Sequence, residues 1–169
     1  MLVGLGVRLG FVAAESDQAT KVGDSNFYFG VARQVVDGDG FIRPFEFEAA
    51  GARIETAEHP PLFPVVLAIP SALGLRSPAA AAIFCSFIGA ATLLLIAALG
   101  RKVGGDAVGL VAAGLAAVFP VLWQPNGLLL SETLYIPIVT DCCCWRTRSG
   151  SAPRHCAGAA SECWSDSPR

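Results

Sequence analysis

The sequence predicts an all-α integral membrane protein, with several transmembrane helices and an amphipathic interfacial helix in a long first extracytoplasmic loop. Of the 169 residues, 53% are hydrophobic and only 15% are charged, whereas soluble domains carry about 25% charged residues. The mean hydropathy is +0.54. The apolar residues come in blocks, and one long polar stretch separates the first two. The net charge is −2, and the sequence has no basic patch with interleaved aromatics. The lack of such a patch argues against a nucleic-acid partner.

The first predicted membrane helix covers residues 2–14, with Arg8 as its one charged residue. A helix of this length rises about 20 Å, which is short of the roughly 30 Å hydrocarbon core. A secretory signal peptide is the alternative, but the basic n-region is weak and no clean small-residue cleavage site precedes Glu15. We therefore expect a transmembrane helix clipped at its start.

The polar stretch, residues 15–60, is the predicted extracytoplasmic loop. Within it, residues 26–36 have an amphipathic helical pattern, and a helix of this kind can lie flat in the headgroup region. Its apolar face carries Tyr28, Val31, Ala32 and Val35. Glycines in the segment 38–40 are expected to end the helix, because glycine accepts left-handed backbone. Residues 41–56 are then predicted to be extended or irregular.

The next apolar segment, residues 62–75, contains Pro64 and Pro70. Each proline removes a backbone donor and kinks a helix, and the segment is short for a full crossing. A re-entrant or interfacial segment is therefore favoured over a transmembrane helix. If it did span, the long loop would move to the same side as Arg101.

Two stronger apolar blocks, residues 79–100 and 107–123, are predicted transmembrane helices, and residues 128–140 form a partial one. Arg101 and Lys102 lie in the short loop between the two blocks. Positive residues in short loops favour the cytoplasmic side. The sequence therefore predicts a multi-pass cell-membrane protein whose long first loop is extracytoplasmic.

Residues 141–169 differ in character from the rest of the chain. Five of the six cysteines lie here, mixed without period among arginines, serines and prolines. We interpret this tail as a frameshifted, disordered segment. Acylation of the adjacent cysteines 142–144 is one alternative, and zinc binding is another, although no C-x-x-C pair supports it. No metal site is therefore predicted.

Three polar side chains are candidates for chemistry. Asp24 precedes the amphipathic helix, where it could serve as an N-cap or as a reactive carboxylate. His59 precedes two prolines that hold it extended, so it is either a rigid loop end or an imidazole able to bind a phosphate. Glu132 lies in an apolar run, where an acid is either at the membrane edge or faces a cavity.

Four motifs follow one another along the chain: Gly23-Asp24-Ser25-Asn26-Phe27-Tyr28, Ala32-Arg33-Gln34-Val35-Val36-Asp37-Gly38-Asp39-Gly40-Phe41, His59-Pro60-Pro61-Leu62-Phe63-Pro64 and Leu130-Ser131-Glu132-Thr133-Leu134-Tyr135. In this order and with this hydropathy they resemble the GT-C glycosyltransferases. The nearest branch is the dolichyl-phosphate-mannose protein mannosyltransferase-like and RgtA/B/C/D-like group, which includes the aminoarabinose transferases. The resemblance covers about residues 20–140.

The resemblance implies transfer of a sugar from a polyprenyl-phosphate donor to a hydroxyl of a glycan, lipid or protein, with inversion and without a cofactor. Asp24 would be the general base. Tyr28, His59 and Glu132 would bind substrate, with His59 at the lipid phosphate. Residues 1–140 would be the N-terminal part of such an enzyme, inactive on its own because family members have more helices. The alternative is a non-enzymatic polytopic membrane protein, such as a transporter subunit or an assembly factor.

Overall fold

A computed structural model describes residues 2–15 and 23–148 of the chain, and these residues are mainly helical with no strand among them. The prediction of an all-α fold is confirmed. The elements are α1 (Leu2–Glu15), α2 (Gly23–Asp37), α3 (Pro44–Ala50), α4 (Leu62–Ala72), α5 (Pro78–Val118), the 3₁₀ turn η1 (Pro120–Leu122), α6 (Gln124–Gly127) and α7 (Glu132–Arg148). One isolated antiparallel bridge joins Ile42 and Glu55.

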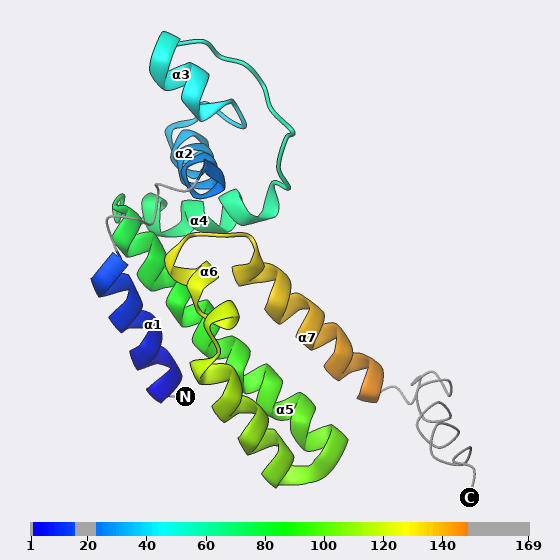
Figure 1. Ribbon diagram of the computed structural model, residues 1–169. Coiled ribbons are helices and arrows are strands. Elements are labelled where there is room, and N and C mark those ends of the chain that lie inside the picture. The colour runs from blue at the N-terminus through cyan, green and yellow to red at the C-terminus, as the bar shows by residue number, and fades with distance from the viewer. Residues whose placement is uncertain (1, 16–22, 149–169) are drawn as a thin grey trace, which may run out of the picture.

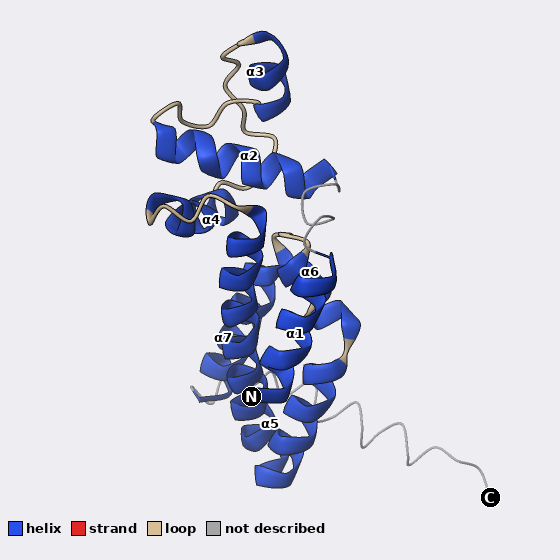
Figure 2. Cartoon of the chain, turned by 90° about the vertical axis from the view of Figure 1, so that its left-hand side faces the viewer, coloured by secondary structure: helices blue, strands red, loops and turns tan. Residues whose placement is uncertain are grey.

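The helices form an elongated bundle with a cap at one end. α1, α5 and α7 run along the length of the bundle, while α2, α3 and α4 are stacked beyond its upper end (Figure 1). Seen from the side, α2 and α4 lie across the end of the bundle rather than along it (Figure 2). The predicted amphipathic segment 26–36 therefore falls inside a helix that lies flat on the bundle. Within the predicted segment 62–75, α4 forms a helix that does not run alongside α5 (Figure 1).

α5 is a helical hairpin rather than one straight rod. Its 41 residues include non-helical backbone at Gly104 and Gly105, and Gly105 has a φ of 83°. The chain reverses there, and the two arms lie side by side (Figure 1). A Cβ added to Gly100 would lie 2.8 Å from the Cα of Gly109. The two arms thus approach backbone to backbone, which only residues without a side chain permit.

The two predicted spans 79–100 and 107–123 correspond to these arms, but the second arm ends at Val118 because Pro120 follows and cannot continue the helix. In the part of the chain that the structure describes, α5 is the one helix long and apolar enough to cross a membrane. α1 and α7 have 14 and 17 residues. By length and composition, the described residues therefore show one candidate membrane helix, whereas the sequence predicted several.

Two segments differ from their predicted conformation. Residues 41–56 contain α3, which has Pro44 in its first turn and Gly51 in left-handed conformation at its end. Both are ordinary helix boundary residues, so a short helix forms where extended chain was expected. α7 runs on to Arg148, eight residues into the tail predicted to be disordered. Residues 149–169 lie outside the described part.

The end of α7 is held by packing against α5. The side chain of Cys144 is buried, with an exposed fraction of 7%, and its Sγ lies 3.7 Å from the carbonyl oxygen of Leu95. Nζ of Lys102 donates to the carbonyl oxygen of Cys144 at 2.7 Å. These tertiary contacts explain why a segment without helical periodicity is helical.

The main apolar core lies between the cap and the bundle. It joins α1, α2, α4, the start of α5 and the turn before α7. Its members are Val12, Phe27, Tyr28, Phe29, Val31, Ala32, Phe63, Leu67, Ala68, Ala81, Ala82, Cys85 and Leu129. Because the residues that open α2 belong to this core, its packing sets the position of the first turn of α2.

Candidate functional site

The first turn of α2 presents a carboxylate to solvent. Asp24 is the second residue of α2, and its side chain is 67% exposed. A negative charge is favourable at this end of a helix because the free N–H groups and the helix dipole point toward it. The neighbouring Ser25 is fully buried, so the helix start is fixed while the carboxylate remains accessible.

The structure places His59 beside Asp24, although 35 positions separate them. Nε2 of His59 lies 3.6 Å from Oδ1 of Asp24, and the imidazole is 21% exposed. This distance is slightly longer than a hydrogen bond, and a small rotation of the exposed carboxylate would form one. Two of the predicted site residues therefore form one polar pair.

Aromatic rings hold the imidazole on two sides. The ring centroid of Phe27 is 4.4 Å from that of His59, and the ring centroid of Tyr28 is 5.1 Å away, edge to face. Tyr28 in turn packs edge to face on Phe63 at 5.0 Å. The predicted substrate-binding residue Tyr28 is itself only 4% exposed, so it supports the imidazole from within the core.

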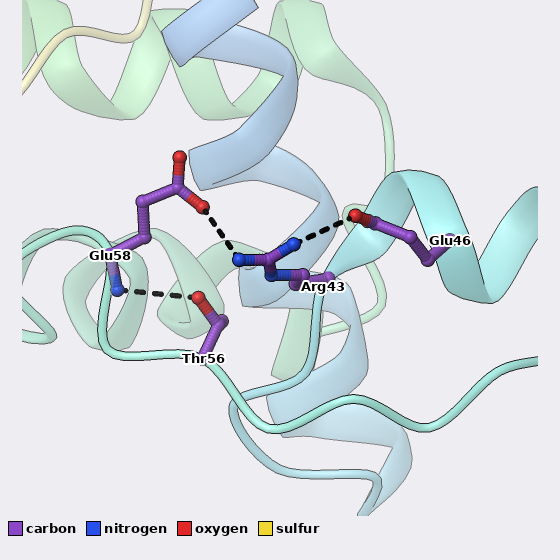
Figure 3. A network of polar contacts seen from close by, with 4 residues as sticks. All are labelled: Arg43, Glu46, Thr56 and Glu58. Atoms are coloured by element: carbon purple, nitrogen blue, oxygen red, sulfur yellow. Dashed lines mark hydrogen bonds and ion pairs between the residues drawn. The ribbon is translucent and has the colours of Figure 1, made fainter.

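Polar contacts in the loop fix the chain that leads to His59. Arg43 contacts Glu46 at 3.2 Å and Glu58 at 4.0 Å. The backbone N–H of Glu58 donates to Oγ1 of Thr56 at 3.2 Å. Figure 3 shows Arg43 lying between the two glutamates, which come from α3 and from the end of the loop. Glu58 is thereby tied to Arg43, immediately before His59.

A second contact links α2 to the turn that opens α7. The hydroxyl of Ser25 donates to the carbonyl oxygen of Leu128. In the same turn, Leu129 has a φ of 53° and is fully buried. A non-glycine residue at positive φ is strained and persists only where its surroundings hold it. The start of α7 is thus fixed relative to Asp24.

An apolar groove of about 380 Å³ lies between the start of α4 and the start of α7. Its walls are mainly hydrophobic, and the residues that form them are Pro60, Leu62, Phe63, Ser131, Glu132, Leu134, Tyr135 and Ile138. The groove begins at the residue after His59 and includes Phe63, which contacts Tyr28. An apolar chain could therefore lie in it with a polar end near the Asp24–His59 pair.

Glu132, the fourth predicted site residue, is not part of the cluster formed by Asp24, Tyr28 and His59. It is exposed and lines the groove, and in the described part it makes no hydrogen bond or ion pair with Asp24 or His59. It also borders a water-sized cavity of about 10 Å³ that Arg8 and Asn126 line. The structure therefore brings Asp24, Tyr28 and His59 together, whereas Glu132 lies at the start of α7 in the wall of the groove.

Sequence reasoning missed two contributors to this region. Phe27 was read only as part of a motif, yet it stacks on His59. Arg8 was noted as a charge in an apolar helix, yet it is 1% exposed and hydrogen-bonded to the segment before α7. A lone charge inside an apolar run is the signal that could have identified Arg8, because such residues face protein partners rather than lipid.

No group of three or more His, Cys, Asp or Glu side chains able to hold a metal ion occurs in residues 2–15 and 23–148. Comparison of the chain with protein-family models, with curated proteins and with solved structures finds no match.

Proposed function

We propose that this chain carries the general-base site of a membrane glycosyltransferase of the GT-C kind. Such an enzyme transfers a sugar from a polyprenyl-phosphate donor to an acceptor hydroxyl, here with Asp24 as the general base. The observation that carries the proposal is the exposed carboxylate of Asp24, 3.6 Å from His59. His59 directly precedes Pro60, which is part of the wall of an apolar groove of about 380 Å³. A lipid-linked sugar needs both a polar reacting centre and an apolar place for its chain.

The proposed step is a single displacement at the anomeric carbon. The acceptor oxygen forms a bond to this carbon while the bond between the carbon and the phosphate oxygen breaks. The bonding pair leaves with the polyprenyl phosphate, and the hydroxyl proton passes to the carboxylate of Asp24. A positioned carboxylate of this kind contributes about 10²–10⁴-fold to the rate. The exposure of Asp24 supports the role, because the acceptor must reach it.

The arrangement of charges supports an extracytoplasmic site. Arg101 and Lys102 lie near the turn of α5 at Gly104 and Gly105, and the cap that carries Asp24 lies at the opposite end of the bundle (Figure 1). Positive residues in short loops favour the cytoplasm. The flat placement of α2 and α4 across the bundle end suits an interfacial layer, where the headgroup of a lipid donor would lie.

The groove supplies the site for the apolar part of the donor. Its lining carries one acid, Glu132, and is otherwise made mostly of aliphatic and aromatic side chains. Burying methylene groups of a polyprenyl chain would contribute about 0.8 kcal/mol each. The position of Glu132 allows its carboxylate to contact sugar hydroxyls while the chain lies beyond it.

Lipid binding can be tested without knowing the sugar. The protein would be reconstituted in nanodiscs with a photoreactive undecaprenyl phosphate, and labelled peptides would be mapped. We expect labels on residues of the groove, such as Leu62 and Tyr135. A second apolar pocket of about 470 Å³ near Leu115 and Phe119 serves as an internal control. Equal labelling of both pockets would mean nonspecific contact with lipid and would contradict the proposed donor site.

Transfer itself would be measured with a panel of radiolabelled undecaprenyl-phosphate hexoses and pentoses, by loss of the label from the lipid fraction. We expect Asp24→Asn to abolish transfer and Asp37→Asn, the acid at the other end of the same helix, to leave it unchanged. Full activity of Asp24→Asn would exclude the general-base role. Specific labelling of the groove with no transfer from any donor is the result expected if the chain is inactive on its own.

A further inference from the structure

The two ring nitrogens of His59 have different surroundings. Nε2 points toward the carboxylate of Asp24 at 3.6 Å. Nδ1 is buried and finds no hydrogen-bond partner among the described residues. Because Nδ1 is enclosed, only Nε2 is available for a polar contact. A donor phosphate would have to compete with Asp24 for this single nitrogen.

The contact with a carboxylate also indicates which nitrogen carries the proton. In a neutral imidazole one nitrogen is a donor and the other an acceptor, and the hydrogen bond of one fixes the state of the other. A carboxylate only accepts, so Nε2 is the donor and Nδ1 the unprotonated nitrogen. The other tautomer would carry its proton on Nδ1 and leave a buried N–H without an acceptor, which is more costly.

The ring has little freedom to turn away from Asp24. Phe27 stacks on it at 4.4 Å and Tyr28 meets it edge to face at 5.1 Å. Pro60 and Pro61 restrict the backbone that follows, and proline also restricts the residue before it. Asp24, by contrast, is 67% exposed and would be free to rotate without a partner. His59 is therefore the rigid member of the pair, and it can hold the carboxylate of Asp24 in one orientation.

We propose that His59 is a positioning residue that orients the carboxylate of Asp24, and that it is not the ligand of the donor phosphate. This assignment rests on the proposed function for the role of Asp24, and it changes the role that the family resemblance implies for His59. Nε2–H donates to Oδ1, which turns the second carboxylate oxygen toward the acceptor. When Asp24 takes up the hydroxyl proton on that second oxygen, the bond from Nε2–H persists and no proton moves to His59.

The chain offers a direct test because it contains only two histidines. In a His155→Ala variant with ¹⁵N-labelled histidine, every imidazole signal comes from His59. We expect a protonated Nε2 and an unprotonated Nδ1, and a displaced Nε2 resonance in Asp24→Asn. Asp37→Asn should leave the resonance in place. Thermal unfolding of the variants checks that each is folded, which is expected because Asp24 is mostly exposed.

The same sample distinguishes the two roles when undecaprenyl phosphate is added. If the chemical shift of Nε2 is unchanged in Asp24→Asn, the proposal is overturned, because the Asp24–His59 pair then does not exist in solution. A resonance that moves only when the lipid phosphate is added overturns it in favour of phosphate binding. Neither result depends on sugar transfer, so the outcome of the transfer measurement bears on the proposed function alone.

Once transfer is measurable, substitutions at position 59 separate the roles further. A glutamine amide reaches about as far as Nε2, whereas an asparagine amide reaches only as far as Nδ1. We expect His59→Gln to keep most of the activity. His59→Asn and His59→Lys should lower kcat about tenfold or more, because a small misplacement of a catalytic group is costly, with KM for the lipid donor unchanged. Preserved activity and a lower KM in His59→Lys would overturn the positioning role.

Discussion

Nε of Arg8 donates a hydrogen bond of 2.9 Å to Oδ1 of Asn126, across 118 positions of the chain. Both side chains are almost fully buried. Arg8 also donates to the carbonyl oxygens of Gly4 and Leu122, and Nδ2 of Asn126 donates to Oγ1 of Thr133 at 3.2 Å. This cluster ties α1 to the segment between α5 and α7, and thereby fixes the wall of the groove that carries Glu132.

The first prediction concerns this cluster. Asn126→Leu keeps the branched shape of the side chain but leaves Arg8 and Thr133 each without one partner. We expect a loss of about 2–3 kcal/mol in the free energy of unfolding, because a buried charged donor is left unsatisfied. Denaturant unfolding in detergent would measure it.

A double-mutant cycle with Arg8→Met provides the control. Residues that share a hydrogen bond show a coupling energy of about 0.5–3 kcal/mol. We therefore expect Asn126→Leu to cost clearly less in the Arg8→Met background. Additive losses would show that the two side chains do not depend on one another.

The second prediction concerns the close approach of the two arms of α5. A Cβ on Gly109 would lie 2.6 Å from the carbonyl oxygen of Ala97, which is backbone and cannot turn aside. Gly109→Ala should force the arms apart and destabilise the protein by about 1–3 kcal/mol. Thermal unfolding would show the loss as a lower Tm.

Gly114→Ala is the matched control on the same arm, because a Cβ there meets nothing within 4 Å. Alanine is the better helix former, so this variant should gain up to about 1 kcal/mol. Equal effects of the two substitutions would contradict the backbone contact between the arms.

The third prediction concerns the contact between Ser25 and the carbonyl oxygen of Leu128. Ser25→Ala removes the side-chain bond that ties the start of α2 to the turn before α7. We expect a loss of about 1–2 kcal/mol in the free energy of unfolding, because the donor is fully buried.

Because the same contact sets one side of the groove, Ser25→Ala should also weaken photolabelling by undecaprenyl phosphate at Tyr135. Ser77→Ala, which removes the N-cap of α5, supplies a control that lowers stability at a distance from the groove. If both serine variants weakened labelling equally, the effect would follow from stability and not from the Ser25 contact.

The fourth prediction concerns Arg43, which contacts Glu46 and Glu58 on the surface. Arg43→Met should change the free energy of unfolding by no more than about 1 kcal/mol, because exposed ion pairs contribute little. Hydrogen exchange should nevertheless increase locally at residues 54–58, where the loop loses its anchor.

Raising the salt concentration should reproduce part of this local increase in the unchanged protein, because salt screens exposed charges. Arg76→Met, which breaks a surface pair with Asp37, is the control. It should leave residues 54–58 unaffected. Unchanged exchange at these residues in Arg43→Met would show that the network does not hold the loop.

Several features were readable from the sequence because they depend on neighbours in the chain. Uncharged runs of residues predicted both arms of α5, and the spacing of apolar residues at 26–36 predicted α2. The prolines at 64 and 70 indicated that α4 would not be an ordinary spanning helix. The bounds were less certain: α3 was missed because seven residues give little periodic signal, although Pro44 and Gly51 mark its ends.

The arrangement of the candidate site was decided by tertiary structure. The sequence alone identified Asp24, Tyr28, His59 and Glu132 and the apolar character of the segments around them. It did not predict the 3.6 Å contact between Asp24 and His59, the absence of Glu132 from that pair, or the bond from Arg8 to Asn126. Backbone propensity and hydrophobic period act over a few residues, whereas these contacts arise where α2, α4 and α7 pack. Only the packing of helices distant in the chain brings such side chains within reach.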